Sequence, residues 1–284
     1  MNQLLNPIYC PIKKQGFFFI TTLIKRVILL LSAFLFLLGI YLLIDREQDM
    51  NILREIIYKE IGKVEHNGSF VEKLNQIVYN KGGFKKNSNF FFIKKLGPTP
   101  IQILTHGGDC SDKSRLLSAM LLSVGIPSTL VMLHSCAGCP PNHTVVEVRD
   151  KNNYMVADPV YNLVFPKTKY KYFSLEELMN NPEILNQRLD ELIKIRGIND
   201  KIYLYKRHTE IYSFPKTINW DKNKLTYLIK DILYNIDKNP NLISRPHFLE
   251  DPKLFLSITS LFACSILLFI YFVMCFLTRK SHKL

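Results

Sequence analysis

The sequence predicts an α+β protein in which helices pack on a small antiparallel sheet, held between two transmembrane helices. Three observations support this. Two long runs near the ends of the 284-residue chain contain no charged residue. Between these runs, apolar residues first recur at helical spacing. After residue 127 they fall into short segments rich in β-branched residues, which is typical of strands.

The two uncharged runs are long enough to cross a membrane. Val27–Ile44 contains 18 residues, which as a helix span about 27 Å of hydrocarbon. Leu254–Leu277 is a second run of 24 residues. The first run continues into YLLIDREQ without the small residues of a cleavage site, so we expect an uncleaved anchor rather than a signal peptide.

The distribution of charge predicts the orientation of these anchors. The net charge is +13, and all 24 acidic residues lie between the two runs. The flanking residues 1–26 and 278–284 carry four and three basic residues and no acidic ones, which places both tails in the cytoplasm and the middle segment outside it. Much of the positive charge therefore reflects topology, and no basic motif interleaved with aromatic residues occurs, so we expect no nucleic-acid partner.

The predicted organisation follows the chain in order. It comprises a cytoplasmic tail (1–26), a transmembrane helix (27–44), a core domain (45–172), an extracytoplasmic helical extension (173–253), a second transmembrane helix (254–277) and a second cytoplasmic tail (278–284).

The core domain begins with helices and ends with strands. Helical spacing is present in residues 50–62 and 68–82, and residues 85–100 are expected to form a loop with a short extended apolar piece. A helix starting at Cys110 carries an apolar stripe and is stopped by Gly125 and Pro127. Short strands are expected at 128–133, 143–148 and 153–158, the last two joined as a hairpin by DKNN.

The extension is expected to be helical. Ser174 and Glu177 have the spacing of a capping box, and Pro182 interrupts the helix that they begin. Two further helical patterns follow, at residues 182–195 and 220–237.

The cysteines suggest one disulfide and one free thiol. Outside the two uncharged runs and the tails, the chain has Cys110, Cys136 and Cys139, an odd number for an oxidising compartment. Cys136 and Cys139 are the natural pair, and a disulfide there would stiffen the loop before His143. Zinc held by both cysteines with His134 and His143, and redox-active thiols, remain alternatives.

Cys110 stands where a thiol becomes reactive. The free N–H groups and the dipole at a helix N-terminus favour the thiolate. A cysteine nucleophile also needs a base and a group that orients the base. If the hairpin has a two- or four-residue turn, paired residue numbers sum to 303, and His143 and Asp158 become diagonal neighbours on one face, roughly 7–8 Å apart at the backbone.

Three ordered blocks carry a family resemblance. The blocks are GDCSDKSRLLSAMLLSVGIPSTLVML, HTVVEV and YMVADPVYN. Together they resemble the transglutaminase-like cysteine-enzyme superfamily, over roughly residues 50 to 172. The resemblance implies a papain-like core, and the position of the anchors suggests a bacterial, membrane-anchored member. It further implies that Cys110 is the nucleophile, His143 the general base and acid, and Asp158 the residue that orients the imidazole.

The residues before the helix fit these roles. The N–H of Cys110 and a neighbouring N–H, from the stretch Gly108, Asp109 and Cys110, would hold the oxyanion of an acyl intermediate. Gly107 and Gly108 would allow close approach of the substrate and the backbone, whereas Asp109 is expected to cap the helix and Asp112 to interact with its dipole.

The resulting hypothesis is a membrane-anchored cysteine amide or peptide hydrolase, or an acyltransferase, acting through a thioester on a protein or peptide substrate at the membrane or envelope. No metal or cofactor is needed. The expected location is the inner (plasma) membrane, with the main domain in the periplasm and the bilayer contacted through two helices. The alternative is a non-catalytic binding or assembly module that presents the same cleft to a partner in a membrane complex.

Overall fold

The computed structural model describes residues 12–65, 67–86, 88–136, 138–150, 153–168, 171–205, 212–220, 224–236 and 240–281. These residues belong to two compact units. One contains residues 12–45 and 254–281, and the other is Arg46–Lys253. The hairpin turn expected at DKNN includes residues 151 and 152, which lie outside the described residues.

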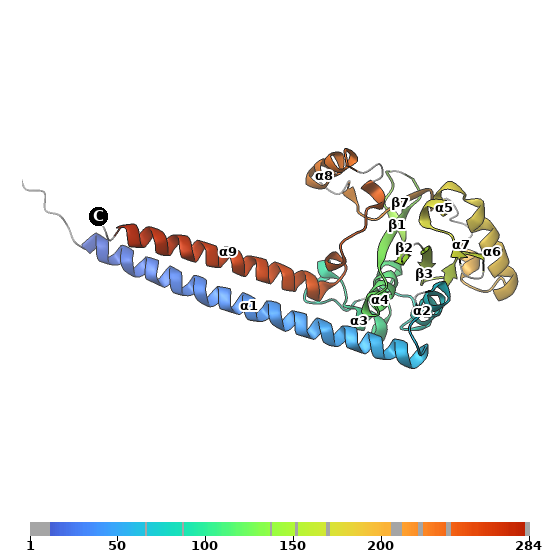
Figure 1. Cartoon of the computed structure of the whole chain (residues 1–284), viewed down its shortest axis with the longest axis horizontal. Coiled ribbons are helices and arrows are strands. Elements are labelled where there is room, and N and C mark those ends of the chain that lie inside the picture. The colour runs from blue at the N-terminus through green and yellow to red at the C-terminus, as the bar shows by residue number, and fades with distance from the viewer. Residues whose placement is uncertain are drawn as a thin grey trace, which may run out of the picture. The chain divides into compact units, whose positions relative to one another are not determined.

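Two long apolar helices, α1 (Ile12–Glu60) and α9 (Pro252–Ser281), contain the segments predicted to span a membrane (Figure 1). Both are long and apolar enough to do so by length and composition. Within the first unit, the Ser257 hydroxyl donates to the Gly39 carbonyl at 2.8 Å. A Cβ at Gly39 would lie 2.7 Å from Leu261 Cγ, so only a glycine allows this approach. The helix predicted at 50–62 is not separate, because α1 continues unbroken to Glu60.

The Arg46–Lys253 unit is built on an antiparallel sheet in the order β4-β3-β2-β1-β7. The strands are β1 (Ser128–His134), β2 (Pro141–Asp150), β3 (Asn153–Asp158), β4 (Leu163–Val164) and β7 (Phe214–Lys216). The three strands expected from β-branched segments are present. Val146 pairs with Ala157 and Arg149 with Tyr154, so the paired numbers sum to 303 as expected. A separate ladder joins β5 (Pro166–Thr168) to β6 (Lys171–Tyr172).

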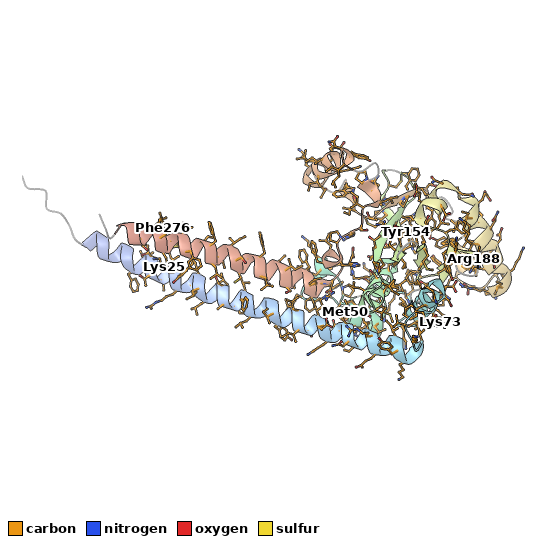
Figure 2. All side chains as sticks on the ribbon, in the orientation of Figure 1. Lys25, Met50, Lys73, Tyr154, Arg188 and Phe276 are labelled. Carbon is orange, nitrogen blue, oxygen red and sulfur yellow. A yellow bond between two sulfur atoms is a disulfide. The ribbon has the colours of Figure 1, made fainter. Side chains whose placement is uncertain are left out.

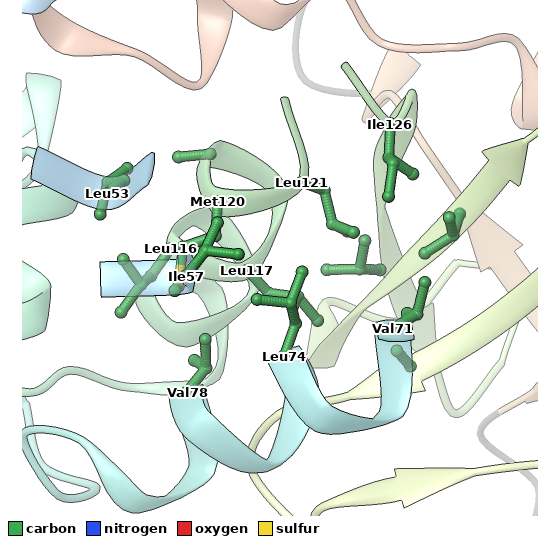
Figure 3. Packing of buried hydrophobic residues seen from close by; sticks show 14 of the residues in the cluster. Leu53, Ile57, Val71, Leu74, Val78, Leu116, Leu117, Met120, Leu121 and Ile126 are labelled. Atoms are coloured by element: carbon green, nitrogen blue, oxygen red, sulfur yellow. The ribbon is translucent and has the colours of Figure 1, made fainter. Parts of the chain in front are cut away.

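One face of the sheet is covered by α2 (Gly68–Asn80), α4 (Cys110–Ser123) and the end of α1. Figure 3 shows how side chains of these helices interlock. Leu53 and Ile57 of α1 and Leu74 of α2 pack against the buried stripe of α4, which includes Leu117 and Met120. The apolar stripe predicted for this helix is therefore its core-facing side.

The prediction of a loop at residues 85–100 is only partly correct. Among its described residues there is no strand, and the chain forms the 3-10 turn η1 (Lys94–Leu96) before α3 (Pro100–His106). A capping box begins α3, in which Thr99 accepts from the Gln102 N–H at 3.2 Å and Gln102 accepts from the Thr99 N–H at 2.8 Å. Sequence analysis did not predict α3, although the residues of this capping box are visible in the sequence.

The second face is covered by α5 (Leu175–Asn180), α6 (Glu183–Arg196) and α7 (Ile202–Tyr205). Ser174 and Glu177 form the expected capping box at the start of α5. Arg188 of α6, labelled in Figure 2, donates to the Val164 carbonyl of β4 at 2.9 Å. The segment predicted as a helical extension therefore completes the core, and it also supplies the strand β7. It ends with α8 (Lys224–Tyr234) and the 3-10 turns η4 (Pro240–Leu242) and η5 (His247–Leu249).

A buried lysine fixes the helix that carries Cys110. The Lys113 ammonium donates to the carbonyls of Val78, Tyr79 and Lys81, at 2.7, 3.0 and 3.1 Å. These carbonyls belong to the C-terminal end of α2, where the helix dipole favours a positive charge. Burial, with a contribution from Lys201, lowers the pKa of Lys113 to about 8. The three acceptors explain how a buried ammonium is tolerated here.

We expect Lys113→Met to lower the free energy of unfolding by about 2–4 kcal/mol, because three carbonyls lose a charged donor. Denaturation of the full-length protein in detergent measures this change. The matched control is Lys81→Met, whose exposed side chain forms only a 3.3 Å ion pair with Glu60 and should cost about 0.5 kcal/mol or less. Equal stability of the two variants would contradict the role assigned to Lys113.

Candidate active site

Cys110 is the first residue of α4, and its position is set by a capping box. Asp109 accepts from the Asp112 N–H at 3.1 Å, and Asp112 accepts from the Asp109 N–H at 3.4 Å. The sequence predicted Asp109 as the cap, and the structure confirms it. Because the Asp109 N–H is used in the cap, the N–H of Cys110 is the better candidate for binding an oxyanion. Cys110 itself is half-buried.

The glycines before Cys110 serve the fold of the chain itself. Gly107 has a φ of 77°, and a Cβ there would collide with the Gly82 carbonyl, 1.8 Å away. A Cβ at Gly108 would lie 2.3 Å from the Asp112 Cβ. Gly108 also accepts from the Lys85 N–H at 3.1 Å. The close approach at these glycines is therefore to other parts of the chain itself, the Gly82 backbone for Gly107 and the Asp112 side chain for Gly108, and neither glycine lines the cavity beside Cys110.

His143 and Asp158 meet on one face of the sheet. His143 lies near the start of β2 and Asp158 ends β3, and the observed register places their side chains on the face covered by α5–α7. His143 Nε2 lies 2.6 Å from Asp158 Oδ2. Asp158 Oδ1 accepts from the N–H groups of Val160 and Tyr161, at 2.9 and 3.3 Å. Both carboxylate oxygens are thus satisfied, although Asp158 is fully buried.

The thiol completes this chain of polar groups. Cys110 and His143 line the same cavity, so the thiol and the imidazole border one space. Burial by itself lowers the pKa of His143, but the charge of Asp158 and hydrogen bonds with Asp158 and Cys110 outweigh it and raise the pKa from 6.5 to about 10. With Nε2 engaged by Asp158, Nδ1 is the nitrogen left to face the thiol.

Two tyrosine rings pack against the imidazole and a third tyrosine contacts one of them, and sequence analysis identified none of the three. The rings of Tyr161 and Tyr205 each lie 5.6 Å from the His143 ring in edge-to-face geometry. The Tyr205 hydroxyl donates to the Tyr212 hydroxyl at 3.3 Å. Burial raises the pKa of Tyr205 and Tyr212, so both hydroxyls are neutral near pH 7. These rings exclude water from one side of the bond between His143 and Asp158.

A pocket of about 280 Å³ lies beside the thiol. Its walls come from α4, β1, β2 and the segment before α9, and consist of Cys110, Ser111, Arg115, Leu130, Met132, Pro141, Asn142, His143, Thr144, Arg245 and Glu250. Arg115 and Arg245 both form ion pairs with the buried Glu250. Residues 245 and 250 lie far from any sequence block that marked the site, so no local signal could have identified them.

Cys136 and Cys139 form a disulfide in the connection between β1 and β2. The ring of His134, at the end of β1, is hydrogen-bonded through Nδ1 to the Cys139 carbonyl at 2.6 Å. The set His134, Cys136, Cys139 and His143 is not assembled as a zinc site, because the two sulfurs are bonded to each other and His143 is bonded to Asp158. Over the described residues, no group of three or more His, Cys, Asp or Glu side chains is placed to hold a metal.

Comparison with known proteins identifies a family that matches this part of the chain. Residues 56–159 match the family model of the transglutaminase-like superfamily, and this range includes Cys110, His143 and Asp158. This part of the chain is similar in sequence to the transglutaminase-like superfamily. The resemblance read from the three sequence blocks is thereby confirmed at the level of the superfamily.

Among solved structures, a protein from Cytophaga hutchinsonii described as a candidate cysteine protease is similar at 21% identity and a TM-score of 0.32. The similarity covers 44% of this chain and 42% of that protein. A search of curated proteins gave no match.

The raised pKa of His143 predicts how stability depends on pH. A histidine whose pKa is higher in the folded state contributes stability that is fully present below about pH 6.5 and is lost as the pH rises through about 10. We therefore expect the difference in Tm between the wild type and His143→Gln to shrink across this range. Thermal melts of both full-length proteins at matched pH values measure it. Parallel profiles would show that the imidazole is not held as the cation.

Proposed function

We propose that this protein is a membrane-anchored cysteine amide or peptide hydrolase, or acyltransferase, that acts through a thioester acyl-enzyme. The observation that carries the proposal is the chain of side chains from Asp158 through His143 to Cys110. The imidazole is buried against the carboxylate at 2.6 Å and lines the same pocket as the Cys110 thiol. A cysteine at a helix N-terminus with a paired imidazole is the arrangement that nucleophilic catalysis requires.

Acylation begins when Cys110 Sγ attacks the carbonyl carbon of an amide. The π electrons of the carbonyl move to its oxygen, and the N–H of Cys110, which has no acceptor within the first turn of α4, stabilises the oxyanion. The His143 imidazolium then donates its proton to the amide nitrogen, the C–N bond breaks and the amine leaves. A thioester on Cys110 and a neutral imidazole remain.

Deacylation reverses these roles. Neutral His143 removes a proton from the acceptor, whose oxygen or nitrogen attacks the thioester carbonyl, and Cys110 leaves as the thiolate. Water gives a carboxylic acid, and an amine gives a new amide. We favour water as the acceptor, because a macromolecular amine needs a binding site of its own. Asp158 keeps the imidazole oriented through both half-reactions.

The two apolar helices support a membrane location. α1 and α9 contain the segments of 18 and 24 residues without charge, and the basic, acid-free tails favour a cytoplasmic position for both termini. The Arg46–Lys253 unit then faces the opposite side, the periplasm or cell exterior. The proposed substrate is a protein or peptide at that surface, with no cofactor required and with a membrane-complex partner as a further proposal.

The first test of the proposal is the reactivity of Cys110. We expect iodoacetamide to alkylate Cys110 at least about tenfold more slowly in His143→Gln than in the wild type at pH 6–7, because the thiolate loses its cation. Mass spectrometry of the full-length protein in detergent follows the reaction, with Cys110→Ala identifying the peptide.

The matched control is His134→Gln, which removes another buried histidine, one whose ring is bonded to the Cys139 carbonyl. Its alkylation rate should equal that of the wild type. If His143→Gln also reacts at the wild-type rate, the site has no activated thiol, and a binding module that presents the pocket to a partner becomes the better interpretation.

The second test addresses topology. In intact cells that express a Cys110→Ala background, a membrane-impermeant maleimide should label Lys171→Cys, an exposed position on β6. It should not label Lys283→Cys until the membrane is permeabilised. Labelling of Lys283→Cys but not Lys171→Cys before permeabilisation would reverse the proposed orientation.

A further inference from the structure

A loop in the Arg46–Lys253 unit exposes large apolar side chains beside lysines. We define the Phe92 loop as residues 88–97. Phe92 and Ile93 at its tip are 72% and 56% exposed. Lys94 and Lys95 follow directly and are also exposed. Lys85 and Lys86, which precede the loop, are exposed as well. An apolar tip flanked by cations is an unusual surface for a part of the chain that simply faces water.

The tip is held outward by the loop's own backbone. The Phe91 N–H donates to the Gly97 carbonyl at 3.0 Å, and the Ile93 N–H donates to the Phe91 carbonyl at 2.7 Å. The Phe91 ring packs edge-on against the Phe92 ring, with centroids 4.6 Å apart. These contacts close a tight loop, so that the exposure of Phe92 and Ile93 is part of its fold.

The Phe92 loop lies where the chain leaves this unit for the apolar helices. The Lys253 ammonium lies 6.0 Å from the centroid of the Phe91 ring and 2.7 Å from the Asp49 carboxylate. Lys253 directly precedes the uncharged run that starts at Leu254. Arg46, two residues after the first uncharged run, pairs with Asp251 at 2.6 Å. Both chain ends of the unit and the loop therefore share one face.

We propose that the Phe92 loop docks on the bilayer surface, with Phe92 and Ile93 in the boundary between headgroups and acyl chains and the lysines on anionic phosphates. The proposal rests on the membrane anchoring in the proposed function. If Leu254 enters the bilayer, Lys253 is one Cα step of about 3.8 Å from it, and the loop that contacts Lys253 cannot be remote from the headgroups. Aromatic and aliphatic tips with flanking lysines match the chemistry of an anionic lipid surface.

Docking would also place the pocket near the membrane. Glu250, in the pocket wall, is three residues from Lys253 and thus at most about 11 Å away along the chain. Phe84, just before the loop, forms a β-bridge with Gly108, two residues from Cys110. The substrate class that fits this arrangement is a peptide segment lying at, or emerging from, the bilayer surface.

Quenching by brominated acyl chains tests the docking. The full-length protein is reconstituted in nanodiscs containing anionic lipid, and emission from an added tryptophan is compared with the baseline of the buried Trp220, the chain's single native tryptophan. We expect quenching of Phe92→Trp at least about twofold stronger than that of Ile195→Trp. Ile195 lies on α6 and is 71% exposed, so it is a matched control.

A third variant separates failure of the loop from failure of the anchor. Phe269→Trp, on α9 and 69% exposed, reports insertion of that helix. Quenching at Phe269→Trp without quenching at Phe92→Trp overturns the docking and leaves a protein partner as the occupant. No quenching at Phe269→Trp overturns the anchoring and the docking together. Equal quenching at Phe92→Trp and Ile195→Trp overturns the docking as non-specific.

The lysines have a test of their own. In the Phe92→Trp protein, the double substitution Lys94→Glu and Lys95→Glu should weaken quenching in anionic nanodiscs and leave it unchanged in purely zwitterionic ones. Unchanged quenching in both lipids would overturn the assignment of anionic headgroups as the ligand.

Discussion

The hydrogen bond between His143 and Asp158 is the interaction on which the rest of the domain is organised. A buried carboxylate is costly unless its oxygens are paired, and here one oxygen meets the imidazole while the other accepts two backbone N–H groups. The bond requires the β2–β3 register, because a slip of one residue would place the two side chains on opposite faces of the sheet. Sheet pairing and site chemistry are therefore one constraint.

This requirement explains why residues that follow the matched segment 56–159 also belong to the site. Residues 56–159 contain the thiol, the imidazole and the carboxylate. The Tyr205 ring that covers the imidazole, and the Arg245 and Glu250 side chains in the pocket wall, come from later in the chain. A sheet face carrying a buried charge pair needs a cover, and α5–α7 provide it. The matched segment alone would expose the bond to water, which would weaken it.

How well each feature could be predicted from the sequence depends on how far apart in the sequence its interacting residues lie. Asp109 and Asp112 cap α4 through contacts three residues apart, and the hairpin register follows from a short turn, so both are visible in the sequence. Thr99 and Gln102 carry an equally local signal for α3, which went unrecognised. In contrast, β7 is three residues long and contains Pro215, with no alternation to mark it; proline is tolerated there because β7 is an edge strand. Tyr205 meets His143 only through tertiary packing.

The same reasoning applies to the two chain ends of the domain. Arg46 and Asp251 are 205 residues apart in sequence, yet their side chains form a 2.6 Å ion pair, and Asp49 and Lys253 form a second at 2.7 Å. All four side chains are largely buried, so these pairs are screened less than exposed ones and hold the ends at a fixed separation. Glu250, next to Asp251, faces Arg115 and Arg245 in the pocket. The adjacent residues Glu250 and Asp251 thus act in two places. Asp251 helps to hold the two ends of the domain together, and Glu250 forms part of the charged pocket wall beside Cys110. The position of this wall therefore depends on the separation of the two ends of the domain.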